Sequence, residues 1–141
     1  MKRYLPILIT LGLIFLVLIV LTYWEPEKKD ILDGSIWRVE EISAQPLLEF
    51  STLTIRFHNQ KISGSSECNR FKGRYTIAAD IIQFEVLDRT TDECMEPGIM
   101  RLDEDFLNSL EKAARFSFSG NDLKLYTEDG HELLDFVLMT E

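Results

Sequence analysis

The chain has 141 residues and a formal net charge of −9, and hydrophobic residues make up 45% of it. This length suits one domain and excludes a large multi-domain enzyme, a collagen and a repeat array, while the apolar content excludes a disordered acidic tail. All 24 acidic residues but only 13 of the 15 basic ones follow residue 24, so residues 25–141 have a net charge of −11. Such an acidic part disfavours nucleic acid, whose affinity comes largely from Lys and Arg at phosphates, and it also disfavours anionic lipid headgroups.

The N-terminal segment is apolar and uncharged from Leu5 to Trp24. Twenty helical residues span roughly 30 Å, the thickness of the hydrocarbon core of a bilayer. Lys2 and Arg3 precede this run, so the positive-inside rule places the N-terminus in the cytoplasm. We therefore expect residues 1–24 to form a single-pass membrane anchor that contacts the membrane through residues 5–24. The C-terminal domain is then extracytoplasmic, in the periplasm.

A cleaved signal peptide is the competing interpretation of this segment. Its apolar region is normally 7–15 residues long and ends at small residues, whereas residues 22–25 read Thr-Tyr-Trp-Glu. A buried helix of a soluble protein is a third alternative, because every face of the segment is apolar. The first two interpretations both export residues 25–141.

The exported part begins with a charged stretch, residues 25–33, which contains Pro26 and is expected to be a tether reaching at most about 30 Å. Residues 34–141 are expected to form one domain. Short segments in it alternate apolar and polar residues with the period of a half-buried strand. These segments are residues 36–42, 52–57, 71–77, 82–86, 116–118, 123–125 and 134–138.

Turn residues and one helical pattern complete the fold prediction. Gly120-Asn121 and Asp129-Gly130 are hairpin signals, and weaker turns are expected at residues 58–60 and 78–80. Residues 99–114 carry apolar side chains at helical spacing. The pattern predicts an α+β, mainly β domain: a small antiparallel barrel of roughly eight strands, closed or cracked. Its one helix follows the fifth strand and covers an open seam or end.

One stretch resembles a known family. Residues 63–75 read SGSSECNRFKGRY and are similar to the Cys-Asn-Arg-Phe-x-Gly-x-Tyr signature of the META/HslJ-like domain of bacterial envelope proteins. The opening Gly-x-x-Trp and a later Thr-x-x-x-Cys element follow the same pattern, so the resemblance covers about residues 32–138. Glu67 and Asp92 depart from it, because the family usually has Gly and Met there. The motif positions are Trp37, Gly64, Cys68, Asn69, Arg70, Phe71, Gly73, Tyr75, Thr90 and Cys94.

The resemblance implies a β-rich envelope domain without an established catalytic activity. Some relatives are linked to heat or antibiotic stress, and the fold is similar to that of lipid-binding secretion pilots. Within the motif, Gly64, Gly73 and Asn69 are interpreted as structural: the glycines allow bulges or close backbone approach, and the Asn bonds a loop backbone.

Cys68 and Cys94 are the only cysteines. An even pair in a small exported domain predicts a disulfide, which is also the family pattern. Metal binding with His58 and His131 is the weaker alternative, because the four residues lack paired spacing. A catalytic Cys with a His base is another, and neither His has a supporting motif. We expect no metal, no cofactor and no catalytic residue.

Arg70, Lys72 and Arg74 form the densest basic cluster of this acidic domain and share one strand face, opposite Phe71 and Tyr75. The simplest interpretation is cross-strand pairing with carboxylates such as that of Glu85. The functional alternative is contact with an anion or a partner. The acidic groups at residues 92–93, 96 and 103–105 are expected to be solvated.

Two classes of function remain. The first is a non-enzymatic, membrane-tethered envelope module that binds an envelope protein or an apolar ligand and supports resistance to envelope stress. The alternative is an inhibitor or accessory subunit of an envelope enzyme. A cavity inside the barrel favours the first class, and a protruding ordered loop favours the second.

Overall fold

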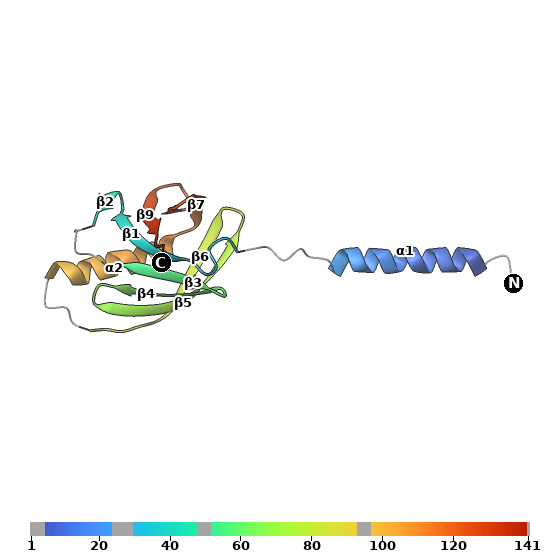
Figure 1. Cartoon of the computed structure of the whole chain (residues 1–141), viewed down its shortest axis with the longest axis horizontal. Coiled ribbons are helices and arrows are strands. Elements are labelled where there is room, and N and C mark those ends of the chain that lie inside the picture. The colour runs from blue at the N-terminus through green and yellow to red at the C-terminus, as the bar shows by residue number, and fades with distance from the viewer. Residues whose placement is uncertain (1–4, 24–29, 48–51, 93–96, 141) are drawn as a thin grey trace.

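The computed structural model describes residues 5–23, 30–47, 52–92 and 97–140. It contains an N-terminal helix and a β-rich domain, which Figure 1 shows apart from each other. The elements in chain order are α1 (Leu5–Tyr23), β1 (Ile36–Ile42), β2 (Gln45–Pro46), β3 (Thr54–His58), β4 (Lys61–Ser66), β5 (Asn69–Ala78), β6 (Ile81–Arg89), α2 (Pro97–Lys112), β7 (Arg115–Ser119), β8 (Asp122–Tyr126) and β9 (Glu132–Leu138).

Eight of the strands form an antiparallel barrel. Neighbours pair in the order β1-β3-β4-β5-β6-β7-β8-β9, and β9 pairs back onto β1, while β2 is a short addition to β1. Only Ile81 and Arg115 pair across β6 and β7, so this seam is nearly open. The connection across it is α2. This confirms the predicted barrel with one helix between its fifth and sixth strands.

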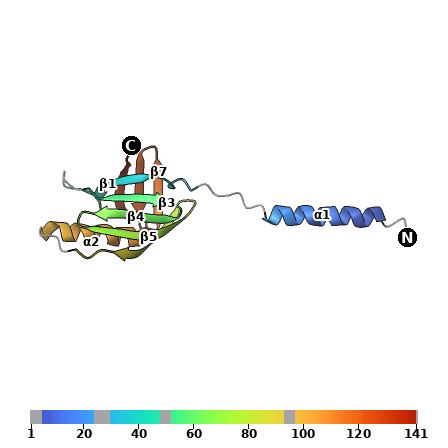
Figure 2. The ribbon, with the colours of Figure 1, turned by 60° about the horizontal axis from the view of Figure 1, so that its bottom comes forward.

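The barrel is filled by its own side chains. Strand β5 alternates buried and exposed residues along most of its length, as the period-2 pattern predicts. Inside, the rings of Phe57 and Tyr75 meet edge to face with centroids 4.9 Å apart. Phe106 from α2 lies 5.5 Å from Phe71. Figure 2 shows α2 alongside the layer of β3, β4 and β5, with strands β7–β9 crossing that layer.

The segment before β1 packs on the barrel. Leu32 is fully buried. The N–H of Gly34 donates to the carbonyl of Phe57 at 2.9 Å, and the hydroxyl of Tyr75 donates to Asp30. Residues 30–33, which we expected to belong to the tether, are therefore part of the packed domain.

The turns follow the predicted positions. Asn59, Gln60, Ala79, Gly120 and Gly130 all have positive φ, as tight hairpin turns require. The helix differs slightly from its prediction over residues 99–114. It begins at Pro97 and ends at Lys112, because the following residues lead into β7.

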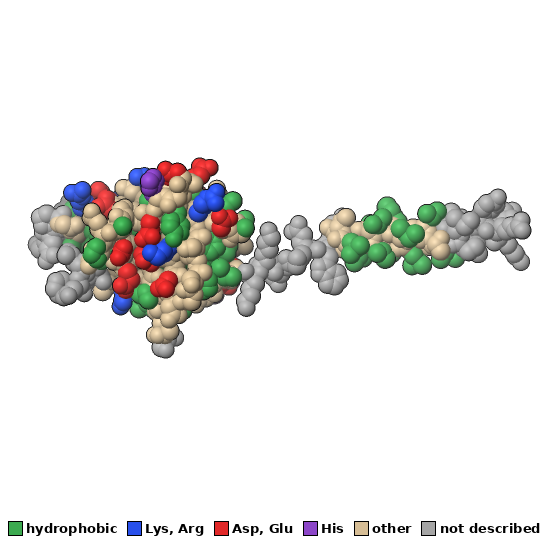
Figure 3. All heavy atoms as spheres, turned by 90° about the horizontal axis from the view of Figure 1, so that it is seen from above, with side chains coloured by type: hydrophobic (Ala, Val, Ile, Leu, Met, Phe, Trp, Pro, Cys, Tyr) green, Lys and Arg blue, Asp and Glu red, His purple; other side chains and the backbone are tan. Residues whose placement is uncertain are grey.

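The sequence of α1 contains no charged residue. On the face seen in Figure 3, hydrophobic side chains line its described part. Its large hydrophobic residues are between 40% and 67% exposed. In the described part of the chain, no helix combines the length and the apolar character needed to cross a membrane. This finding does not bear out the spanning helix expected over residues 5–24.

Candidate functional site

The family motif builds a partly buried polar cluster where the β4–β5 hairpin meets α2. The Nδ2 of Asn69 donates to Oδ2 of Asp103 at 3.0 Å, and the hydroxyl of Ser66 donates to the other oxygen of the same carboxylate. The Oδ1 of Asn69 accepts from the hydroxyl of Thr90 at 2.9 Å and from the N–H of Asp92 at 2.8 Å. These five residues, the Asn69 cluster, tie the hairpin to the helix and to the segment after β6.

Asp103 corrects one expectation. Residues 103–105 were expected to be solvated, but the Asp103 side chain is only 5% exposed, because Ser66 and Asn69 of the hairpin cover it. The sequence does contain a signal for this burial. Asp103 lies three residues before Phe106 and seven before Leu110, which places it on the apolar face of the helix.

The two departures from the family pattern have structural explanations. Glu67 has a φ of 66°, a left-handed conformation in which Gly is preferred, and its carboxylate accepts from the N–H of Thr52 at 2.6 Å. The backbone N–H of Asp92 donates to the side chain of Asn69. Because this contact does not use the Asp92 side chain, it places no requirement on the residue type at position 92.

The two motif glycines stand where backbones approach closely. A Cβ added to Gly64 would lie 2.0 Å from the carbonyl oxygen of Thr54 and 2.6 Å from the ring of Phe71. A Cβ on Gly73 would lie 2.2 Å from the carbonyl oxygen of Glu85, beside an irregularity in the pairing of β5 with β6. No side chain fits at either position.

Two of the three motif aromatics, Trp37 and Tyr75, form hydrogen bonds from inside the barrel. Trp37 is 1% exposed, and its Nε1 donates to the hydroxyl of Ser35 at 2.6 Å. The ring of Phe118 packs edge-on against it at 5.9 Å. Two effects raise the pKa of the Tyr75 hydroxyl well above its ordinary value: burial has the larger effect, and the hydrogen bond to Asp30 adds to it.

Cys68 lies half-buried in the β4–β5 turn and does not carry a free thiol. Its predicted partner, Cys94, lies outside the described residues, so the crosslink between them stays a prediction. The structure does not bring the other proposed metal or catalytic residues to Cys68. His58 ends β3 and pairs with Lys61 at the start of β4, whereas Cys68 follows the end of β4. His131 follows the β8–β9 turn, and its Nε2 lies 3.2 Å from a carboxylate oxygen of Asp129.

The predicted basic residues lie exposed on the outer face of β5. Arg74 is opposite Glu85 of β6, and Lys72 is opposite Asp88. In the part of the chain that the structure describes, however, neither forms an ion pair within 4.0 Å, and neither does Arg70. The face is wider than the sequence indicated, because Arg56 of β3 and Lys61 of β4 also lie on it.

A groove of about 340 Å³ is hollowed into this face. Ser63 and Ser65, in the middle strand, leave space between the longer side chains on either side. The lining residues are Ile36, Thr54, Arg56, Ser63, Gly64, Ser65, Arg70, Phe71 and Lys72. We call this feature the basic groove.

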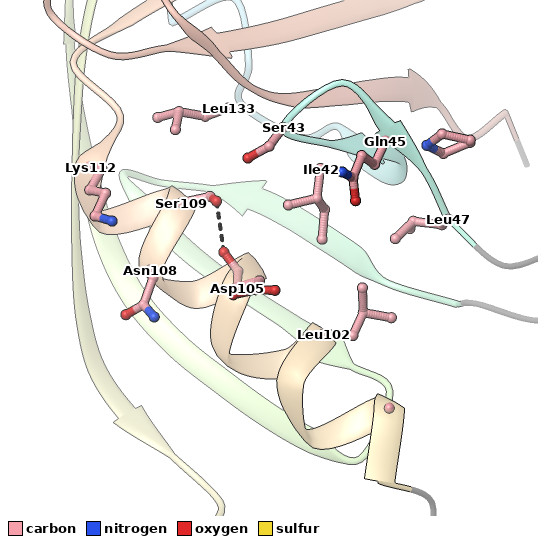
Figure 4. Close-up of a pocket in the computed structure, with 12 residues that line it drawn as sticks. Ile42, Ser43, Gln45, Leu47, Leu102, Asp105, Asn108, Ser109, Lys112 and Leu133 are labelled. Atoms are coloured by element: carbon pink, nitrogen blue, oxygen red, sulfur yellow. Dashed lines mark hydrogen bonds between the residues drawn. The ribbon is translucent and has the colours of Figure 1, made fainter.

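A second cleft, of about 370 Å³, lies between α2 and the β1–β2 hairpin (Figure 4). Ile42, Leu47 and Leu102 contribute apolar side chains to it, while Asn108 and Lys112 are among its polar residues. The hydroxyl of Ser109 turns back to the carbonyl of Asp105 at 2.7 Å. The cleft thus mixes both signs of charge with apolar surface.

Three carboxylates gather on the paired strands β1 and β9. Oxygens of Glu41, Glu132 and Asp135 lie within 4.8 Å of one another. The Lys124 ammonium contacts Asp135 at 2.9 Å and Glu132 at 3.1 Å, and these hydrogen bonds raise its pKa. The group is therefore explained as an ion-pair network around a lysine.

Known structures share this fold. A protein from Burkholderia xenovorans, solved by NMR, is 20% identical with a TM-score of 0.64, over 83% of this chain and 98% of its own. A second NMR structure is 26% identical with a TM-score of 0.61, over 76% and 91%. A DUF4847 family protein from Bacteroides vulgatus is 14% identical with a TM-score of 0.61, over 76% and 94%.

No curated protein matches the chain significantly. The META domain family matches residues 30–139, which include the packed segment before β1, the whole barrel and α2. The matched region also contains the Asn69 cluster and both motif glycines. The chain therefore belongs to the META domain family.

Proposed function

We propose that this protein is a non-catalytic binding module of the bacterial envelope that contacts a protein partner through the outer face of β3, β4 and β5. The observation that carries this proposal is the opposition of like charges on that face. Lys61 and Arg74 are direct cross-strand partners, an arrangement that is unfavourable in an isolated sheet. A domain so rich in carboxylates could neutralise them, yet Lys61, Arg70, Lys72 and Arg74 form no ion pair in the described part of the chain.

The barrel interior is filled by side chains and does not supply the cavity expected to favour a binding module, so we propose the protein-binding form of the module rather than the form that binds an apolar ligand. Trp37, Phe57, Phe71 and Tyr75 are each at most 1% exposed, and Phe106 of α2 adds another ring to the interior. An apolar ligand would have to displace these side chains. A partner with an acidic surface needs no such rearrangement, because charge complementarity on an outer face gives orientation and fast association.

The location is part of the proposal. Large hydrophobic side chains of α1 are exposed along its described part, which favours an apolar environment for this helix. We propose that α1 holds the domain at the cell membrane and that the domain lies outside the cytoplasm, where it supports the envelope under stress.

The test is capture of partners from solubilised membranes by the full chain. Replacing Arg70, Lys72 and Arg74 with Gln should abolish capture, and raising the salt concentration should weaken capture by the wild type. The matched control replaces three exposed basic residues elsewhere: Arg101, Lys112 and Arg115. Undiminished, salt-insensitive capture by a folded triple variant contradicts the proposal. If the captured partner is an enzyme, an activity assay shows whether the module is its inhibitor or accessory subunit.

A further inference from the structure

The register of β3, β4 and β5 arranges the basic groove in rows. Ser63 of β4 lies between Arg56 of β3 and Lys72 of β5. In the next row, Ser65 lies between Thr54 and Arg70. Because neighbouring strands are about 4.8 Å apart, the two cations of the first row start roughly 10 Å apart, with a short hydroxyl side chain between them.

The charges around the groove are one-sided. Three of its lining residues are basic and none is acidic, in a chain with 24 acidic residues. Carboxylates stand at its margins: Asp88 and Glu85 of β6 are opposite Lys72 and Arg74, beyond β5, and that of Glu67, in the turn after β4, accepts from the N–H of Thr52, two residues before Thr54. In the described ranges, no carboxylate comes within 4.0 Å of Arg56, Arg70 or Lys72.

We propose that the basic groove binds a phosphate-type oxyanion. Arg56 and Lys72 bind it from opposite sides, the hydroxyls of Ser63 and Ser65 donate to it from the floor, and Arg70 closes one end. This inference goes beyond the proposed protein contact, because it assigns a small phosphate ligand to the groove on the same outer face.

The donor set fits a phosphate better than a carboxylate. Guanidinium groups match phosphate oxygens in pairs, and an ammonium group adds a compact charge. Donors on two sides and on the floor can serve oxygens that point in several directions. A planar carboxylate offers only two oxygens and would leave part of this set unused.

The experiment uses the isotope-labelled full chain in uncharged lipid discs, titrated with inorganic phosphate and followed by NMR. The backbone signals of residues 63–65 should shift to saturation, and the dissociation constant should rise with sodium chloride concentration. Arg56→Gln should weaken binding by about tenfold, because it removes a charge-assisted hydrogen bond. Arg101→Gln removes the same charge from an exposed site on α2 and should leave the affinity within about twofold.

A second arm separates the two sources of phosphate. Discs that contain phosphatidylglycerol, without added phosphate, should shift the same signals if a lipid headgroup is the ligand, whereas a response to free phosphate alone indicates a soluble phosphate compound. No shift in either arm, or equal losses in Arg56→Gln and Arg101→Gln, overturns the inference. Shifts caused by hexaglutamate but not by phosphate would also overturn it, while leaving the proposed protein contact in place.

Discussion

Asp103 shows how one buried carboxylate can join two elements. It lies in α2, and its two oxygens accept hydrogen bonds from Ser66 and Asn69 of the β4–β5 hairpin. No basic side chain forms an ion pair with it in the described residues, so Ser66 and Asn69 are the partners that satisfy its buried oxygens. Asn69 thus connects the two sides, donating to Asp103 and accepting from Thr90 and Asp92.

Asp103→Ala should lower the free energy of unfolding by about 2–3 kcal/mol, because it leaves a buried hydroxyl and a buried amide without their acceptor. Glu104→Ala, at the exposed neighbouring position, is the control and should change stability by less than about 0.5 kcal/mol. Urea denaturation followed by circular dichroism measures both. Equal effects of the two substitutions would show that the Asn69 cluster does not stabilise the fold.

Gly64→Ala should be more damaging than its size suggests. The added methyl group would collide with the backbone oxygen of Thr54, which cannot move without disturbing the pairing of β3 and β4. We expect a loss of about 3 kcal/mol or more. Gly98→Ala is the matched control, because nothing lies within 4 Å of the new methyl group. Thermal melts that place the two variants together would contradict this interpretation.

At the scale of elements, the β4–β5 hairpin is connected to the rest of the domain at several points. Its turn holds Glu67, which bonds Thr52 before β3, and Cys68, whose thiol is not free. The following Asn69 reaches both α2 and Thr90. A crosslink to Cys94 would fix the same turn to the segment that enters α2.

Thiol labelling of the denatured, unreduced protein from the envelope should find no free Cys. A Cys68–Cys94 crosslink closes a loop of 27 residues and should contribute about 3–4 kcal/mol in the chain-entropy model. Cys68→Ala and Cys94→Ala should therefore lower the melting temperature equally. Two labelled thiols, or unequal effects of the two substitutions, would rule out this pairing.

Burial of Tyr75 in the barrel, together with its hydrogen bond to Asp30 before β1, makes the stability of the domain fall at alkaline pH. The pKa of Tyr75 is raised in the folded state, whereas in the unfolded chain it stays near the ordinary value of 10.0. Above pH 10 the unfolded chain therefore releases this proton first, so stability present below pH 10 is lost as the pH rises. Tyr75→Phe should flatten this decline. Denaturation midpoints measured from pH 8 to 11 provide the test, and an unchanged slope would contradict it.

At the scale of the whole molecule, an apolar helix is joined to a strongly acidic domain. The helix carries no charge, and residues 25–141 have a net charge of −11, so the two parts favour different environments. Lys2 and Arg3 before the helix set the expected orientation.

External protease acting on intact spheroplasts should digest the domain, as seen by immunoblotting of a C-terminal tag. A cytoplasmic protein serves as the control and should survive until the membrane is lysed. Protection of the tag until lysis would reverse the proposed orientation. Recovery of the intact domain without residues 1–24 would identify a cleaved signal instead.

Local patterns in the sequence predicted most of the architecture. Alternation in residues 71–77, the turn pairs at residues 120–121 and 129–130, and the helical spacing after Gly98 depend only on neighbouring residues, and each reappears in the structure. The family assignment followed from a contiguous motif for the same reason. The outer position of Arg70, Lys72 and Arg74 needed only the period of a strand.

Tertiary structure decided what depends on distant partners. Asp103 is buried because Asn69 and Ser66, which lie 34 and 37 positions earlier in the chain, supply its hydrogen-bond donors. The helical spacing that placed Asp103 on the apolar face did not reveal these donors. The basic groove exists because strand register places Arg56 and Lys72 on either side of Ser63, and no local pattern fixes that register. Residues 30–33 pack on the barrel because Leu32 finds an apolar site there, which their charged surroundings in the sequence concealed.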